Sequence, residues 1–302
     1  METTNEKLLK QKEMKLKEFG SAEDKYVGDL EKIVEVLAVM KKSKTDPDHP
    51  NPMPPDLREG RDKIVEGNFS MIRDYHKDEL QDQLKAALNS PKKLRELFEK
   101  EAATMKSIYG EYATKLKMKL QIIRQHEAYF ARIQRQCGLS KFSMSSQLNG
   151  PMIHLTRYFL FLDSLAKLCT KADWSSEEEE FREAARVARD ISRTTNNLML
   201  AGKVTHLPED EDMSRQGNLL HVGTLVHKRS KQGLSLHSAV ATVIGEHRLK
   251  LFLFKRSLII CHCKRRIGSF QWSGLEASFD EEFKFWIKFS ILKLQVKELL
   301  MI

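Results

Sequence analysis

The stretch 148–162 reads LNGPMIHLTRYFLFL, and its apolar side chains leave little room for a polar face. A helix that is apolar nearly all round is typical of the centre of a helical bundle. Gly150 and Pro151 precede the run, and proline is favoured in the first turn of a helix. Arg157 is the exception, because a guanidinium is rarely buried without a partner. We therefore expect a buried central helix whose Arg157 reaches either an internal acid or an outside partner.

Outward from this stretch, the chain before about residue 205 has the periodicity of helices. Apolar residues recur there every three or four positions, which is the spacing of one helix face. The segment 44–55 is predicted to be a loop, because it holds five of the chain's eight prolines and proline lacks an amide donor. The helices expected from this pattern run over about 22–42, 57–88, 91–138 (long enough to be broken), 150–169 and 177–201.

After about residue 205 the pattern changes to short blocks of β-branched and aromatic residues, separated by glycines and basic residues. Such blocks are typical of strands. Residues 255–257, Lys-Arg-Ser, separate two of the blocks and predict a hairpin. The strands expected from this pattern run over about 219–228, 239–244, 249–254, 258–263 and 283–294.

Helices followed by strands indicate two segregated domains. The predicted fold is mainly α followed by β, an elongated helical bundle and then a partial antiparallel β-sandwich or barrel. The expected divisions are a charged N-terminal helix or linker at 1–20, the helical domain at 21–205, a linker at 206–217 and the strand domain at 218–302.

The composition is that of a folded chain in a reducing compartment. Of the 302 residues, 41% are hydrophobic and 31% are charged, which excludes wholesale disorder. Four cysteines do not make a disulfide scaffold in a chain of this length. The N-terminal sequence is charged and no aliphatic run is long enough to span a bilayer. We therefore expect a cytoplasmic protein, with peripheral contact to membrane or cytoskeleton as an option.

The sequence contains no recognisable catalytic motif. It has no G-x-x-x-x-G-K-[ST] loop, no G-x-G-x-x-G, no H-E-x-x-H and no G-x-S-x-G. Residues 261–263, Cys-His-Cys, are the one tight group of metal-ligating types, but on a strand His262 points away from its two neighbours. His76 falls on an apolar helix face and is expected to be a satisfied core or boundary histidine. We therefore expect no metal, no cofactor and no bond-making chemistry.

The net charge is +9, and a basic run at 247–266 contains no acid. Two interpretations stay open. The run forms either an anion-binding surface, such as a site for a phosphoinositide headgroup, or solvated hairpin ends whose lysines protect a sheet edge. Nucleic acid is disfavoured because no row of aromatic residues is available for base stacking. Weak phosphoinositide contact would use Lys228, Arg229, Lys231 and Arg248.

Three blocks of the sequence resemble the Dbl-homology domain of Rho-family guanine nucleotide exchange factors. Residues 23–30, EDKYVGDL, resemble the first block, in which a Glu stands three residues before a Tyr. Residues 68–76, NFSMIRDYH, resemble the second in the spacing of their Asn and His. Residues 151–162 resemble the third, Pro-Val-Gln-Arg-Ile-x-[Lys/Arg]-Tyr-Pro-Leu-Leu-Leu. Ile153-His154 stands there in place of Gln-Arg, and Phe159 in place of Pro.

The strand blocks resemble the pleckstrin-homology domain that follows in this family, so the resemblance covers about residues 20–300. Modules of the Trio, kalirin and obscurin type are the nearest relatives we expect. Three more strands and a helix would follow the segment 285–298 in a pleckstrin-homology fold, so the strand domain is expected to be truncated. Two groups of apolar side chains would then lose part of their cover or lie near an unpaired edge: Leu251, Leu253, Ile259 and Cys261, and Trp286 and Phe289.

The resemblance implies a factor that stimulates GDP release from a Rho-family small GTPase, of Rho or Rac type, by remodelling its switch regions and displacing magnesium. It assigns Glu23 to the first switch. It assigns Arg157 and Asn196 to the second, with Asn197 as the alternative if the alignment shifts by one residue. These residues are then expected to share one partly exposed surface. The alternative is a non-catalytic helical scaffold, or a degenerate exchange-factor module, that binds a GTPase or a membrane surface.

Overall fold

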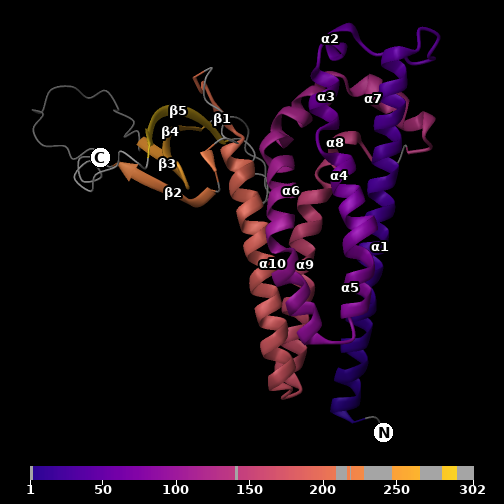
Figure 1. Ribbon diagram of the computed structural model, residues 1–302, viewed down its shortest axis with the longest axis vertical. Helices are drawn as coiled ribbons and strands as arrows, with labels where there is room; N and C mark the ends of the chain where they lie inside the picture. The colour runs from indigo at the N-terminus through magenta and orange to yellow at the C-terminus, as the bar shows by residue number, and fades with distance from the viewer. Residues whose placement is uncertain are drawn as a thin grey trace, which may run out of the picture. The chain divides into compact units, whose positions relative to one another are not determined.

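The computed structural model describes residues 3–139, 142–208, 216–217, 219–227, 247–265 and 281–290. They belong to two compact units, Met1–Met199 and Leu200–Ile302, each described here by itself (Figure 1). The first unit is helical and the second contains the strands, so the prediction of a helical region followed by strands is confirmed. Within the described residues, no helix combines the length and apolar character needed to cross a membrane.

The helical unit is a bundle in which α1 packs against α9 and α4, and α6 packs against α9. Figure 1 shows the long helices running alongside one another. The elements in chain order are α1 (Thr4–Thr45), α2 (Pro55–Arg58), α3 (Arg61–Glu66), α4 (Phe69–Asp74), η1 (Tyr75–Leu80), α5 (Gln81–Ala87), α6 (Pro91–Gln125), α7 (Glu127–Gln136), α8 (Met144–Leu148), α9 (Gly150–Lys171) and α10 (Ser175–Ala201).

Helix α1 begins earlier than the apolar pattern predicted. A capping box fixes its start, because the Thr3 hydroxyl accepts a hydrogen bond from the Glu6 amide and the Glu6 carboxylate accepts one from the Thr3 amide. The polar stretch that follows is helical because straight-chain charged residues lose little rotamer freedom in a helix. The predicted apolar face is buried, and it extends back to Glu23 and Phe19.

Residues 57–88 do not form the single helix that the pattern predicted. Gly60 and Gly67 adopt positive φ values of 93° and 50°, which interrupt the helix on either side of α3. After α4 the chain continues as a π-helical segment, η1, which contains His76. Such segments are rare and frequently occur at functional sites.

The long helix predicted over 91–138 is broken into α6 and α7. Ser90 caps α6 by accepting a hydrogen bond from the Lys93 amide, and Pro91 occupies the first turn as predicted. At His126 the backbone leaves the helical region, with φ −119° and ψ 30°, and α7 starts at the next residue.

Helix α9 starts at Gly150, as the Gly-Pro pair predicted, but it is not buried all round. Leu155, Tyr158 and Leu162 lie in the core and are at most 2% exposed. Ile153 and Leu160, in contrast, are 52% and 53% exposed. The prediction of a helix buried on nearly every side is therefore wrong for one face.

The described residues of the strand unit form a five-stranded sheet. Its strands are β1 (Val204–Thr205), β2 (Leu219–His227), β3 (His247–Phe254), β4 (Ser257–Arg265) and β5 (Glu281–Ser290). Their order is β1-β5-β4-β3-β2, with β1 parallel to β5 and the other neighbours antiparallel. The predicted hairpin is confirmed, because Leu253 pairs with Leu258 across the turn at 255–256. This curled sheet (Figure 1) agrees with the predicted partial sandwich or barrel.

The cover of the sheet differs from the prediction at two positions. Ile259 and Cys261 are 1% and 0% exposed, so the expectation that they lack apolar cover is wrong. Leu251 and Leu253 are half-buried, and Trp286 is 49% exposed. The predicted strand at 239–244 and the predicted end of the last strand, 291–294, lie outside the described residues.

Candidate functional site

The exposed face of α9 has Arg157 at its centre. Ile153, Arg157 and Leu160 are four and three residues apart, which puts them on one side of the helix. All three are exposed, and within the described part of the chain no hydrogen bond or ion pair holds the guanidinium. An arginine flanked by apolar side chains has the composition of a protein-binding surface. We call these three residues the α9 stripe, and their exposure favours an outside partner for Arg157 over an internal acid.

Asn196 and Asn197 lie on α10, which runs antiparallel to α9. Asn196 is one helical turn beyond Ser192, so it lies level with the first turn of α9. Asn196 is exposed and Asn197 is half-buried. Asn196 and the α9 stripe therefore lie toward the same end of one helix pair. The contacts that define the pair are Thr156 Oγ1 to Ser192 Oγ at 3.5 Å, Arg189 to the Phe159 ring at 5.3 Å, and Arg182 Nη2 to Thr170 Oγ1 at 3.4 Å.

Glu23 does not lie on an exposed surface. Its residue is 0% exposed, so the prediction that it shares a partly exposed surface with Arg157 and Asn196 is wrong for Glu23. The physical reason is its position on α1. Tyr26 belongs to the buried face of this helix, and three residues before it the same face continues at Glu23.

Three side chains from two other elements enclose the Glu23 carboxylate. His76 of η1 has its Nδ1 atom 2.6 Å from Glu23 Oε1. On α9, His154 Nε2 lies 2.9 Å from Glu23 Oε2, and the Tyr158 hydroxyl donates to the same oxygen at 2.7 Å. The carboxylate therefore joins α1, η1 and α9 through hydrogen bonds that are fully buried.

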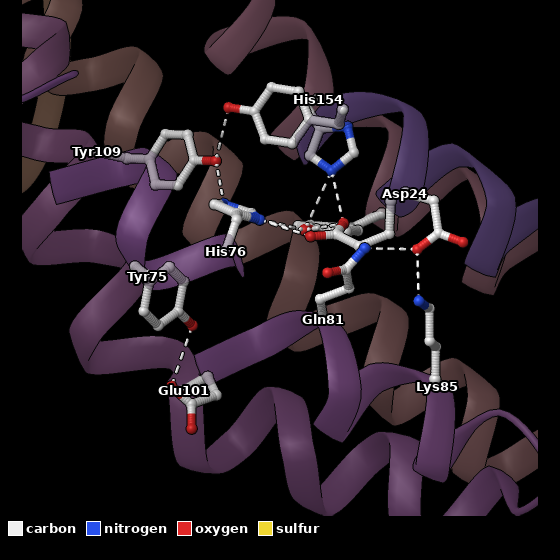
Figure 2. A network of polar contacts seen from close by, with 11 residues as sticks. Asp24, Tyr75, His76, Gln81, Lys85, Glu101, Tyr109 and His154 are labelled. Carbon is white, nitrogen blue, oxygen red and sulfur yellow. Dashed lines mark hydrogen bonds and ion pairs between the residues drawn. The ribbon is translucent and has the colours of Figure 1, made fainter. Parts of the chain in front are cut away.

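The residue next to Glu23 supports this orientation from outside. Asp24 accepts a hydrogen bond from Gln81 Nε2 at 2.6 Å and forms an ion pair with Lys85 Nζ at 2.7 Å, both on α5 (Figure 2). With Asp24 held by α5, Glu23 on the adjacent side of α1 faces the interior. Exposed ion pairs contribute little stability, so their role here is orientation.

A chain of hydrogen bonds continues from His76 away from Glu23. His76 Nε2 lies 2.6 Å from the Tyr109 hydroxyl, which lies 3.1 Å from the Tyr26 hydroxyl. If His76 is neutral, Tyr26 donates to Tyr109, Tyr109 donates to Nε2, and Nδ1–H donates to Glu23. If His76 takes a second proton, Nε2–H donates to Tyr109 and the bond between the two tyrosines reverses. The chain of hydrogen bonds can therefore reverse, although the reversed form leaves the Tyr26 hydroxyl hydrogen without an acceptor among the described residues.

His154 has no such freedom. Its ring stacks on Tyr26 with centroids 3.6 Å apart, and its Nδ1 atom is buried without a hydrogen-bond partner among the described residues. Nε2 must carry the proton that faces Glu23, so a second proton would have to enter at Nδ1. The new N–H would then be buried without an acceptor, which costs free energy. The geometry therefore disfavours a second proton on His154.

Burial and hydrogen bonding set the pKa values of the site in opposite directions. Burial opposes ionisation of Glu23, but the charge of His76 and the hydrogen bonds from His154 and His76 outweigh it and hold the pKa of Glu23 well below its usual range. Burial lowers the pKa of His154, although its hydrogen bond to Glu23 acts against this. Burial and the nearby Glu23 charge raise the pKa of Tyr158 well above its usual value. Glu23 is thus an ionised acceptor for neutral donors on α9.

The same three residues are also the nearest approach to a metal site in the described part of the chain. One ligand atom each of Glu23, His76 and His154 lies within 4.8 Å of the others. Zinc holds nitrogen and oxygen ligands at about 2.0–2.1 Å in a tetrahedron, which separates them by about 3.3 Å. The 2.6 Å between His76 Nδ1 and Glu23 Oε1 is a hydrogen-bond length instead. This arrangement suits a shared proton better than a metal ion.

The sequence pattern contained a signal for part of this site. Glu23 continues the 3–4 spacing of the apolar face of α1, and His76 was expected to be a satisfied core histidine, which its buried hydrogen bonds confirm. The pairing between them was missed because 53 residues separate them and a π-helical segment sets the direction of His76. The participation of His154 and Tyr158 was missed because 131 and 135 residues separate them from Glu23.

The predicted phosphoinositide residues are described only in part. Arg248 is half-buried on β3, where it pairs in register with Val226 of β2. Lys228, Arg229 and Lys231 lie outside the described residues.

Comparison with known proteins identifies the family. A family model described as the RhoGEF domain matches residues 15–196, more than half of the chain. The chain belongs to the RhoGEF domain family. The match includes Glu23, His76, His154 and Arg157, and it reaches Asn196 at its last residue.

Curated relatives of this RhoGEF domain chain carry the name Rho guanine nucleotide exchange factor 25. The protein from Rattus norvegicus is 28% identical over 245 residues, which are 81% of this chain and 39% of the relative. The protein from Homo sapiens is 26% identical over 259 residues, which are 85% of this chain and 41% of the relative. The chain thus spans about two-fifths of the length of these relatives.

Solved structures show the same fold. A Vav1 exchange-factor structure, reported for the role of its PH and C1 domains, superposes with a TM-score of 0.53 at 18% identity. It covers 95% of this chain and 72% of that one. The linker-DH/PH structure of p115-RhoGEF superposes with a TM-score of 0.51 at 14% identity, and covers 86% of this chain and 80% of that one. At these identities the likeness concerns the fold alone, a helical DH region followed by a PH-like sheet.

Proposed function

We propose that this chain stimulates GDP release from a Rho-family small GTPase. The observation that carries the proposal is the α9 stripe. It presents Arg157, which has no hydrogen bond or ion pair among the described residues, between two exposed apolar side chains, within the span that matches the RhoGEF domain. The curated relatives are named as Rho guanine nucleotide exchange factors, which supports the same activity.

The proposed mechanism is a coupling of two binding equilibria, without any covalent step. If the chain binds the nucleotide-free GTPase more tightly than the GDP-bound form, GDP must bind the complex more weakly by the same factor. Each tenfold weakening requires about 1.4 kcal/mol of differential contact. The contacts would remodel the switch regions of the GTPase and displace the magnesium that those regions help to hold.

We assign the binding contacts to the α9 stripe and to Asn196, with Asn197 as the alternative on α10. Arg157 supplies fixed positive charge and up to five donors to the second switch. Glu23 is treated differently, because internal donors from His76, His154 and Tyr158 already occupy both of its carboxylate oxygens. Its carboxylate is therefore not assigned to the first switch.

The test is release of a fluorescent GDP analogue from a panel of Rho-family GTPases, with and without the chain. We expect acceleration of at least about tenfold for one or more members of the panel. Tight binding to a nucleotide-free GTPase without acceleration would support the alternative, a degenerate exchange-factor module. Neither binding nor acceleration with any member would refute the proposal and favour a scaffold.

We further propose a cytoplasmic protein that contacts anionic membranes weakly through its strand unit. The support is the basic composition around β3 and β4 and the net charge of +9. This contact would orient the chain beside a membrane-bound GTPase, and exchange in solution would not require it.

A further inference from the structure

The buried carboxylate of Glu23 is connected to the α9 stripe through hydrogen bonds to the same helix. His154 and Tyr158, which hold Glu23, lie on the same helix as Ile153, Arg157 and Leu160 and alternate with them in sequence. One short segment of α9 therefore contributes its buried face to the carboxylate site and its exposed face to the stripe. A loss of the contacts on the buried face would shift the exposed face as well, because packed helices move as rigid elements.

The site can accept only a limited number of protons before its geometry fails. A second proton on His76 would reverse its hydrogen bond to Tyr109 and leave the Tyr26 hydroxyl hydrogen without an acceptor among the described residues. A further proton on His154 would leave Nδ1–H buried without an acceptor, and a proton on Glu23 would remove an acceptor oxygen from one of its donors. Acid therefore works against the closed arrangement.

The groups around His154 offer no alternative acceptor. From α9 itself, Arg157 places a fixed positive charge three residues away, which disfavours a second cation beside it. The Tyr26 ring covers the face of the imidazole. The titratable and charged groups that face the site are Glu23 and Tyr26 from α1, Tyr75 and His76 from η1, Glu101 and Tyr109 from α6, and His154, Arg157 and Tyr158 from α9.

The sequence makes this arrangement titratable at His154. Histidine changes charge near neutral pH when its surroundings allow. Here the histidine lies at the contact between α9 and the Glu23 carboxylate of α1, with Nε2 2.9 Å from Glu23 Oε2.

We propose that Glu23 is a positioning residue that, with His76 and His154, forms a buried proton-linked latch holding the α9 stripe in its GTPase-binding orientation, so that exchange activity falls on acidification. The activity readout of this inference rests on the proposed function. The latch itself is a property of the free chain and can be measured without a GTPase.

The test compares exchange rates at about pH 7.5 and about pH 5, each corrected for the intrinsic release of the GTPase at that pH, because the lowered pKa of His154 places its protonation below the ordinary histidine range. The informative variant is His154→Gln, whose amide retains a donor toward Glu23 and cannot titrate. The matched control is His126→Gln, which removes a histidine of the same unit between α6 and α7. We expect the wild type and the control to lose about threefold or more in rate, and His154→Gln to lose less than about 1.5-fold.

A histidine NMR titration of the unmodified chain provides the second measurement, which remains decisive if His154→Gln does not fold. We expect His154 to titrate below the ordinary histidine value of about 6.5. An ordinary titration of His154, or the same loss of rate in His154→Gln as in wild type, would overturn the latch. Absence of exchange with every GTPase at about pH 7.5 would instead refute the proposed function, and the titration would then decide the latch alone.

Discussion

At the scale of single residues, Lys119 places an ammonium group in the core of the helical unit. It is 0% exposed, and its Nζ atom has no hydrogen-bond partner among the described residues. Its closest favourable contact is the face of the Tyr112 ring, 4.3 Å from Nζ to the centroid. Burial, with a smaller effect of Lys115, lowers the pKa of Lys119 to about 7.

This residue predicts a pH dependence of stability on the alkaline side. In the unfolded chain Lys119 keeps a pKa near 10.5, so between about pH 7 and 10.5 the unfolded state binds the additional proton. The free energy of unfolding should therefore rise with pH from about 7 to 9, by up to about 1.4 kcal/mol per pH unit. Denaturant titrations at several pH values measure it. Lys119→Met should remove this slope, and an equal slope in both proteins would contradict the account.

The carboxylate site shows a complementary dependence on the acid side. The pKa values of Glu23 and His154 are both lowered in the folded state, so the stability they contribute is present above their unfolded values. It is lost as the pH falls through the folded values. Acid unfolding of the helical unit should therefore begin at the contacts between α1 and α9.

At the scale of elements, two glycines have different roles: one lies inside helix α1 and the other ends helix α3. Gly28 lies inside α1, and a Cβ added there would meet no atom within 4 Å. Gly67 ends α3 with a φ of 50°, and a Cβ there would lie 2.3 Å from Lys119 Nζ. Gly67 is thus required for the break between α3 and α4, whereas Gly28 only weakens its helix.

The matched pair Gly28→Ala and Gly67→Ala tests this distinction. Gly28→Ala should stabilise the chain by about 0.5–1 kcal/mol, because alanine restricts the unfolded chain and favours helix. Gly67→Ala should destabilise it by about 1–3 kcal/mol, because the residue would be strained and crowded. Thermal melts followed by circular dichroism at the helical signal compare the two. Equal shifts, or a stabilising Gly67→Ala, would show that the break is not fixed by glycine.

The sequence predicted some helix boundaries and buried faces correctly and others not, for physical reasons. The start of α9 and the buried face of α1 were predictable because capping and 3–4 spacing are local. The break at Gly60 was missed because the apolar spacing continues through it, and Gly67 was expected at most to bend the helix that it in fact interrupts. Glu23 was expected at the surface because its partners, His76 and His154, are 53 and 131 residues away and no local rule brings them together.

At the scale of the whole molecule, the chain combines a helical unit that presents the α9 stripe with a basic strand unit. The net charge of +9 favours weak, long-range attraction to anionic surfaces. Binding that depends on dispersed surface charge is screened by salt, over a length of about 10 Å at 0.1 M. A rigid headgroup site would be much less sensitive.

We therefore expect liposome binding that varies little between phosphoinositides and falls steeply as salt is raised. Sedimentation of the chain with vesicles of matched charge, containing either a phosphoinositide or phosphatidylserine, measures both properties. Arg248→Ala, in the described part of the sheet, should reduce binding by less than about fivefold, because one dispersed charge contributes about 1 kcal/mol or less. Salt-resistant preference for one headgroup would contradict this expectation.

The central claim is that the helical unit acts on a Rho-family GTPase through the α9 stripe. The most direct measurement is GDP release from the most responsive GTPase, with wild type, Arg157→Ala and the matched control Arg132→Ala. Arg132 is also an exposed arginine, but it lies on α7, away from α9 and α10 in sequence. Both variants should melt within about 0.5 kcal/mol of wild type, since exposed side chains contribute little stability.

The account predicts that Arg157→Ala lowers the release rate by at least about tenfold, since it treats Arg157 as a hot spot of the interface and loss of a hot-spot side chain costs about 2 kcal/mol or more. Arg132→Ala should keep the wild-type rate. Release by Arg157→Ala that matches wild type and the control would contradict the assignment of the stripe to the GTPase.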